Sequence, residues 1–236
     1  MISIVIPAYN EEQRIGETIK KIAEYFKDKK HEIIVVSDGS RDKTKQTVEK
    51  LKIPHTRVIE YQPNRGKGYA VRTGMLEAKG DYILFSDADL STPIEQFNKF
   101  SPYFHEVDVV IGSRALPKSI ITKHQPFYRE LIGKVFNKIV RFFTVRGVYD
   151  TQCGFKMFSK KAAKDIFSRA TIDGFSFDVE ALMLAKKLKY EIMEIPIVWI
   201  NDERSTVKPV KDALRMLRDV IKIRWRLIRG YYDQQQ

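Results

Sequence analysis

The chain has only one cysteine, Cys153, and four histidines among its 236 residues. A single cysteine excludes an intrachain disulfide, which fits a reducing compartment. We expect Cys153 to be a small core residue rather than a nucleophile. The histidines are scattered, and we expect none to bind a metal; they are His31, His55, His105 and His124.

Long apolar runs are also missing from the sequence. No stretch approaches the roughly 18 apolar residues that a membrane-spanning helix needs. The opening residues, MISIVIPAYNEE, carry no basic segment, and their apolar run is too short for a secretory leader. We therefore expect a chain that does not span a membrane. With 43% hydrophobic and 11% aromatic residues, the chain can bury one large α/β core or two small ones.

Acidic residues are scarce in two segments, and this scarcity locates the net charge of +12. Residues 114–148 hold eight Lys or Arg and one acid, and residues 208–229 hold eight Lys or Arg and two acids. The rest of the chain is nearly neutral, at −1. Both basic segments also contain bulky apolar residues. An anionic membrane surface or a nucleic acid could therefore be the partner of these segments.

Strand and helix patterns alternate over the first part of the chain. The runs typical of strands are 2–7, 32–37, 57–61, 81–86 and 107–112. Helical periodicity lies between them; in the first helix it places Ile15, Ile19, Ile22 and Phe26 on one face. This alternation predicts an α/β fold with a mostly parallel, doubly wound sheet and helices on both faces.

Three positions are predicted to mark helix ends. Asn10 would cap the first helix, and Gly80 would follow the end of the third. Thr92, followed by Pro93 and Glu95, has the pattern of a capping box that starts another helix.

The second half is less regular and contains two predicted amphipathic basic helices, at 126–146 and 209–229. In the last helix one apolar face is expected, with Trp225 as an interfacial anchor; its members are Val210, Leu214, Leu217, Ile221 and Ile228. Between the two helices we expect a strand at 151–158, a helix capped by Ser159, a helix at 176–189 and a strand at 191–200. Pro196 favours an edge position for that last strand.

The stretch FSDADLST, residues 85–92, places Asp87 and Asp89 where an apolar run stops. In an extended chain residues i and i+2 point to one side, so these two carboxylates need a countercharge. From the residues alone it could be a metal ion, a lysine or arginine, or water. Asn10, Asp38 and Arg114 also follow predicted strands. Because ligands of doubly wound sheets bind at the carboxyl ends of strands, the sequence predicts a site there.

Six motifs occur in order along the chain: PAYNEE (7–12), SDGSRD (37–42), NRGKGYAVRTGM (64–75), DADLS (87–91), GSR (112–114) and DTQCGFKMF (150–158). With these motifs and FDVEALMLA (177–185), the chain resembles the family 2 glycosyltransferases of the GT-A fold over roughly residues 1–205. Within that family it is most similar to the polyprenyl-phosphate sugar transferases, which make dolichyl-phosphate glucose and mannose.

The resemblance implies an inverting hexose transfer, with glucose favoured over mannose. The donor would be UDP-glucose or GDP-mannose, the acceptor dolichyl or polyprenyl phosphate, and the cofactor Mg²⁺ or Mn²⁺. The enzyme would lie on the cytoplasmic face of a membrane, with a separate membrane subunit as one option. Residues 1–114 would bind the nucleotide sugar and 115–206 the acceptor, within one GT-A domain at 1–206. Residues 207–236 would form the basic C-terminal helix and tail.

The matched positions give individual residues their implied roles. The metal ligands would be Asp87, Asp89 and Ser91; Ser91 stands where mannose synthases often have a glutamine, which leaves the donor open. The nucleotide would contact Pro7, Tyr9, Asn10, Glu11, Asp38, Gly66, Lys67, Asp87 and Ala88. The residues at the reaction centre would be Asp89, Arg114 and Asp150. The acceptor phosphate would meet Arg129, Arg204 and Lys208.

The type of acceptor decides whether the reaction needs a general base. A phosphomonoester is already anionic at pH 7 and needs mainly cations, whereas an alcohol needs a carboxylate base, for which Asp150 and Asp178 are candidates. Transfer to a polysaccharide or protein hydroxyl is thus an alternative. A non-catalytic module that binds a nucleotide sugar or nucleic acid is another. Because the basic segments are also apolar, we expect no nucleic-acid partner. Glu180 could be functional or a buried structural acid.

Overall fold

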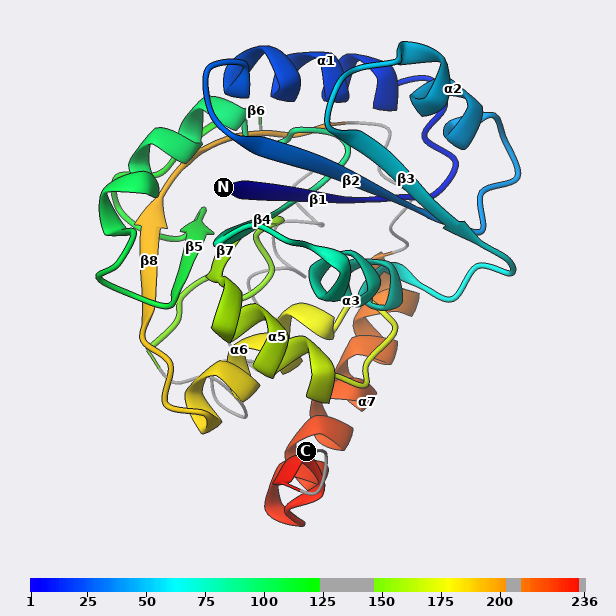
Figure 1. Ribbon diagram of the computed structural model, residues 1–236. Coiled ribbons are helices and arrows are strands. Elements are labelled where there is room, and N and C mark those ends of the chain that lie inside the picture. Colours follow the sequence, from blue (N-terminus) through cyan, green and yellow to red (C-terminus); the bar gives the residue numbers. More distant parts are fainter. Residues whose placement is uncertain (124–146, 203–208, 234–236) are drawn as a thin grey trace.

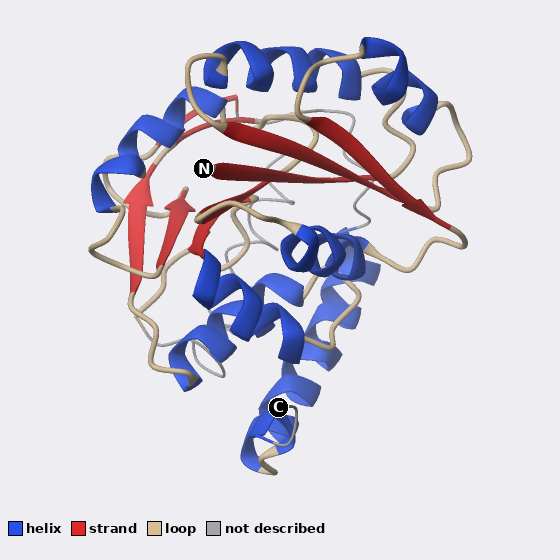
Figure 2. Ribbon diagram, in the orientation of Figure 1, coloured by secondary structure: helices blue, strands red, loops and turns tan. Residues whose placement is uncertain are grey.

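The computed structural model describes residues 1–123, 147–202 and 209–233. These residues form an α/β unit in which helices cover both faces of one large sheet (Figure 1, Figure 2). The strands are β1 (Ile2–Ala8), β2 (His31–Asp38), β3 (Thr56–Tyr61), β4 (Tyr82–Ser86), β5 (Val109–Ser113), β6 (Ile120–Lys123), β7 (Phe155–Ser159), β8 (Ile192–Pro196) and β9 (Val198–Ile200). The helices are α1 (Ile15–Phe26), α2 (Thr44–Leu51), α3 (Lys67–Glu77), α5 (Lys160–Arg169), α6 (Phe177–Lys187) and α7 (Pro209–Ile228), with short 3₁₀ turns η1 (Ile94–Lys99), η2 (Ser101–Tyr103) and η3 (Tyr231–Asp233).

The large sheet has seven strands in the order β3-β2-β1-β4-β7-β5-β8. Every neighbouring pair is parallel except those of β7, which runs antiparallel to both β4 and β5. The prediction of a mostly parallel sheet is confirmed. Because β7 is reversed, the chain just before it lies at the carboxyl ends of β4 and β5, where the predicted site is. β6 and β9 pair in a separate small sheet.

Alternate residues of β1 feed two hydrophobic cores, one on each side of the sheet. Ile4 and Ile6 pack with α1 on one side, whose predicted apolar face is fully buried. Val5 packs on the other side with α3, α5, α6 and α7. Figure 1 shows α1 and α2 above the sheet and these four helices below it.

Two predicted helix starts are wrong, because the side chains found tertiary partners instead. Asn10 has φ 56° and accepts a hydrogen bond from the backbone N–H of Arg41, and α1 begins only at Ile15. Thr92 makes no cap; its hydroxyl lies 3.9 Å from the sulfur of Cys153, and a 3₁₀ turn starts at Ile94. Cys153 itself is buried, as predicted.

The predicted end of the third helix is also wrong, whereas the cap of α5 is confirmed. The third helix ends at Glu77, and the N–H of Gly80 donates to the hydroxyl of Ser3 rather than closing the helix. The hydroxyl of Ser159 accepts from the N–H of Ala162, as a capping serine does.

The predicted strand at 191–200 divides into β8 and β9, which lie in different sheets. Pro196 ends β8 at the edge of the large sheet, as predicted. The predicted helix at 126–146 lies outside the described residues. No helix in the ranges that the structure describes is both long and apolar enough to span a membrane.

The last helix packs through an apolar face other than the predicted one. Met216, Val220 and Ile223 are buried in the core below the sheet. Of the residues predicted to share a face, Leu214, Ile221 and Ile228 are instead exposed, together with Trp225, and Leu217 is half-buried. α7 therefore has a packed apolar face and an exposed apolar face.

Candidate active site

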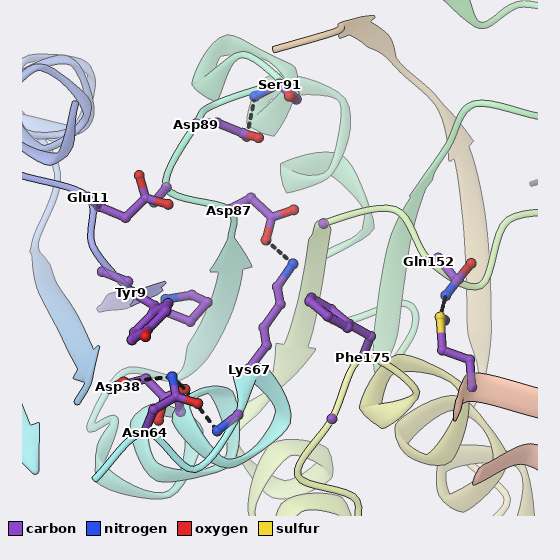
Figure 3. A pocket seen from close by; sticks show the side chains of 18 of the residues that line it. Tyr9, Glu11, Asp38, Asn64, Lys67, Asp87, Asp89, Ser91, Gln152 and Phe175 are labelled. Carbon is purple, nitrogen blue, oxygen red and sulfur yellow. Dashed lines mark hydrogen bonds and ion pairs between the residues drawn. The ribbon is translucent and has the colours of Figure 1, made fainter. Parts of the chain in front are cut away.

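A cleft of about 930 Å³ lies at the carboxyl ends of β1, β2 and β4 (Figure 3). It brings together most of the residues that the sequence singled out: Pro7, Tyr9, Glu11, Asp38, Gly66, Lys67, Asp87, Ala88, Asp89, Ser91 and Arg114. Asn10 is exposed and does not line the cleft, and Asp150 is buried behind Arg114. Arg129, Arg204 and Lys208 lie outside the described residues.

The D-x-D turn follows directly on β4, which ends at Ser86. The carboxylate of Asp87 meets the ammonium of Lys67 at 2.6 Å, and that of Asp89 accepts from the N–H of Ser91 at 2.9 Å. Burial, and next the charge of Asp87, raise the pKa of Asp89. A cation bound beside Asp89 would therefore stabilise the charged form of this carboxylate.

Lys67 reaches Asp87 from the first turn of α3, and Figure 3 shows it extending between Tyr9 and Phe175. Burial alone would lower the pKa of Lys67, but the charges of Asp87 and Asp178 outweigh burial and raise it. Of the three countercharges left open by the sequence, a lysine thus pairs with Asp87 in this structure. The sequence did not predict this partner, because 20 residues separate the two side chains.

Two glycines allow the loop before α3 to pack tightly. Gly66 has φ 109°, and a Cβ there would lie 2.4 Å from the backbone oxygen of Asp173. A Cβ on Gly68 would lie 2.3 Å from the backbone oxygen of Ile172. The loop is thereby fixed against the segment that precedes α6, with Lys67 between the two glycines.

Asp38 anchors the same loop from the end of β2. Its buried carboxylate accepts hydrogen bonds from the side-chain amide of Asn64 and from the backbone N–H groups of Arg65 and Gly66, at 2.8–2.9 Å. Asp38 therefore shapes the glycine-rich loop. Asn64 also lines the cleft, and its position in the NRGKG motif was the signal that could have identified it.

Arg114 and Asp150 form a bidentate ion pair at the far side of the cleft. The guanidinium donates to both carboxylate oxygens at 2.7 and 2.9 Å, and the backbone N–H of Arg114 donates to Asp150 at 2.9 Å. Burial alone would raise the pKa of Asp150, but the charge and hydrogen bonds of Arg114 hold it below its ordinary value. Asp150 thus orients Arg114 and is poorly suited to accept a proton.

Glycine at position 154 makes room for Asp87. A Cβ there would lie 1.8 Å from a carboxylate oxygen of Asp87, and the N–H of Asp87 donates to the oxygen of Gly154. Gly154 lies in the DTQCGFKMF motif, but its contact with Asp87 could not be predicted, because the contact depends on the antiparallel placement of β7. Other lining residues that sequence reasoning missed are Arg14, Gln152, Gly174, Phe175, Trp199, Arg215, Met216, Arg218, Asp219 and Lys222.

The D-x-D turn fits a divalent metal that shares its ligands with a substrate. Among the described residues no group of three or more His, Cys, Asp or Glu side chains could hold a metal by itself. Mg²⁺ typically binds one or two carboxylates and takes its other oxygens from substrate phosphates and water. Asp87 and Asp89 supply those carboxylates from one turn that lines the cleft.

The doubly wound sheet thus gathers a D-x-D turn, a glycine-rich loop and a half-buried arginine at its carboxyl edge, where sheets of this kind bind their ligands. The chain belongs to glycosyl transferase family 2, whose family model matches residues 3–167. It is 34% identical over 98% of its length to the dolichyl-phosphate beta-glucosyltransferase of Dictyostelium discoideum, of which the match covers 76%. For the human protein of that name the identity is 33% over 100% of this chain and 78% of the relative.

Solved structures confirm the GT-A prediction for the fold. The glucosyl-3-phosphoglycerate synthase of Mycobacterium tuberculosis, in complex with Mn²⁺, UDP and phosphoglyceric acid, has a TM-score of 0.70 at 20% identity, over 94% of this chain and 76% of that one. The mannosyl-3-phosphoglycerate synthase of Rubrobacter xylanophilus also has a TM-score of 0.70 at 20% identity, and the match covers 100% of this chain and 76% of that one. The chain is therefore a glycosyltransferase with the GT-A fold.

Proposed function

We propose that this glycosyltransferase moves glucose from UDP-glucose to dolichyl or a related polyprenyl phosphate, with Mg²⁺ or Mn²⁺ as cofactor. The observation that carries the proposal is the cleft with its D-x-D turn, in a chain similar over its whole length to dolichyl-phosphate beta-glucosyltransferases. A β-glucosyl product from an α-linked donor requires inversion, so a single displacement at the anomeric carbon is the simplest route. We favour glucose over mannose as the transferred sugar because these relatives are named dolichyl-phosphate beta-glucosyltransferases.

The nucleotide would occupy the end of the cleft formed by β1, β2 and the glycine-rich loop. Tyr9 is 39% exposed there and offers a ring face on which a base can stack. Asp38 holds the loop through three hydrogen bonds, and Lys67 would project from it toward the diphosphate. A divalent ion on Asp87 and Asp89, with Ser91 beside them, would neutralise the diphosphate as it leaves.

The other end of the cleft suits an acceptor that is already anionic. Asp150 cannot act readily as a base, because both its oxygens accept from Arg114. Asp178 is buried against the ammonium of Lys156 and does not line the cleft. Neither candidate base for an alcohol acceptor is thus available, whereas Arg114 can stabilise developing negative charge. We keep Arg129, Arg204 and Lys208 as proposed contacts of the acceptor phosphate.

The acceptor lipid also implies action at a membrane surface. The exposed apolar face of α7, with Trp225 52% exposed among basic residues, supports this part of the proposal. An anionic cytoplasmic leaflet would attract the basic residues of the helix.

The test is transfer of label from UDP-glucose or GDP-mannose to polyprenyl phosphate by the purified chain. We expect organic-phase label from UDP-glucose only, and only with Mg²⁺ or Mn²⁺. Label from neither donor, or label on soluble acceptors without lipid, would contradict the proposal. Activity of the purified chain alone would also show that no separate membrane subunit is required.

A further inference from the structure

Helix α7 presents three different surfaces along its length. Met216, Val220 and Ile223 face the core. On another side, four apolar side chains are 52–74% exposed; they are Leu214, Ile221, Trp225 and Ile228. At about 100° per residue, Arg218 and Lys222 lie between these two surfaces and next to the exposed apolar residues.

The cationic side of α7 lines the same cleft as the D-x-D turn. Arg215, Arg218 and Lys222 all contribute to that lining. Asp219 lines it too and interacts with the charges of Lys222 and Arg218, but the three cations outnumber this one carboxylate, so positive charge dominates this end of the cleft. The diphosphate of a donor would be held at the other end, by Lys67 and the D-x-D turn. Arg218 and Lys222 therefore line the part of the cleft in which a second anion would lie.

We propose that Arg218 and Lys222 bind the phosphate of the polyprenyl phosphate, while the adjacent apolar residues Leu214, Ile221 and Trp225 contact its chain beyond the first two isoprene units. This inference rests on the proposed function and assigns its acceptor to residues for which neither the sequence motifs nor the relatives' names give a role. Lysine and arginine are the usual partners of a phosphate monoester. A free phosphate would not need the apolar surface, whereas a polyprenyl phosphate combines the two chemistries that α7 places side by side.

The decisive experiment compares Lys222→Gln with Arg229→Gln. Arg229 lies seven residues further on, directly after the end of α7, and it does not line the cleft. Both variants remove one charge from this part of the chain, so a general attraction to lipid would be weakened equally. Steady-state transfer from UDP-glucose to a short, detergent-soluble prenyl phosphate is measured for each, and for Arg218→Gln. Binding of UDP with Mn²⁺ reports whether the donor site is intact.

We expect Lys222→Gln and Arg218→Gln to raise the KM for the prenyl phosphate about tenfold or more, because each loses a charge-assisted contact. The KM for UDP-glucose and the Kd for UDP should stay at the wild-type values, and Arg229→Gln should change the acceptor KM less than about twofold. An equal effect of Arg229→Gln, or a parallel loss of UDP binding, would overturn the inference.

A second pair of acceptors tests the contact with the isoprene chain. Ile221→Ser should raise the KM for a long polyprenyl phosphate while leaving that for a prenyl phosphate of two isoprene units unchanged. Equal effects on both acceptors would refute the apolar contact. If the wild type glucosylates no prenyl phosphate, the proposed function falls together with the inference. If the wild type is active and the α7 variants match it, the function stands and the site on α7 does not.

Discussion

At the scale of single residues, Gly154 controls whether the carboxylate of Asp87, a proposed metal ligand, can keep its position. Replacing Gly154 by alanine would place a Cβ 1.8 Å from a carboxylate oxygen of Asp87, so that side chain must move. We expect Gly154→Ala to weaken Mn²⁺ binding in the presence of UDP by about tenfold or more, equivalent to about 1.4 kcal/mol. Overpacking should also lower the free energy of unfolding by about 1–3 kcal/mol. Titration calorimetry and urea unfolding measure the two effects.

Gly16→Ala is the matched control for this substitution. A Cβ on Gly16 would meet the methyl group of Thr47 at 3.5 Å, which is ordinary contact, and Gly16 lies within α1. The control should bind Mn²⁺ normally and gain about 0.5–1 kcal/mol of stability, because alanine favours the helix. Wild-type metal affinity in Gly154→Ala would show that Asp87 does not depend on this glycine.

Lys67 occupies a second decisive position, because its ammonium competes for the carboxylate that a metal would use. Lys67→Met keeps most of the side-chain length and removes the charge. We expect the affinity of the nucleotide-free protein for Mn²⁺ to rise, since Asp87 loses its ion-pair partner. Affinity for UDP-glucose should fall about tenfold, because a cation beside the diphosphate is lost.

These opposite changes separate the proposed role of Lys67 from a purely structural one. A distorted loop would weaken the binding of both Mn²⁺ and UDP-glucose. Manganese binding can be followed by electron paramagnetic resonance without turnover. Weaker Mn²⁺ binding by Lys67→Met would therefore contradict the idea that Lys67 and the metal compete for the carboxylate of Asp87.

At the scale of secondary-structure elements, the alternation of strands and helices was enough to predict the sheet and the edge that carries the site. It worked because parallel strands place their carboxyl ends together, which gathered Asp38, Asp87 and Arg114. It could not predict that β7 enters antiparallel between β4 and β5, because local periodicity contains no strand order. The contact of Gly154 with Asp87 was missed for this reason.

The same limit explains the errors at helix ends and on α7. Asn10 and Thr92 have capping side chains, yet more distant partners bind them, and no local pattern contains those partners. In α7 the sequence predicted one apolar face, although the helix has two, and the packed face contains Met216 and Val220. Which face meets the core is decided by the rest of the molecule.

At the scale of the whole molecule, the ion pair of Arg114 and Asp150 couples the active site to the stability of the fold. Asp150 is 1% exposed, and both its oxygens accept from Arg114. Asp150→Asn would leave the guanidinium without its countercharge. We expect it to lower the free energy of unfolding at pH 7 by about 1–3 kcal/mol. It should also reduce kcat, because Arg114 loses the group that orients it.

The stability that Asp150→Asn loses relative to the wild type should depend on pH. The pKa of Asp150 is lower in the folded protein than its usual value of about 3.9 in an unfolded chain. Its contribution to stability is therefore full above about pH 4 and is lost as the pH falls through the folded-state pKa. The difference in unfolding free energy between wild type and Asp150→Asn should thus be constant from pH 7 to about pH 5 and shrink below about pH 4.

Asp81→Asn serves as the control for burial. Asp81 pairs with the N-terminal ammonium, whose hydrogen bond lowers the pKa of Asp81, but its side chain is 70% exposed. Salt screens exposed charges far more than buried ones, so 1 M NaCl should abolish the effect of Asp81→Asn and largely spare that of Asp150→Asn. Urea unfolding at low and high salt tests both. An Asp150→Asn effect that vanishes in salt, or that persists undiminished below the folded-state pKa, would mean that Arg114 does not depend on this carboxylate.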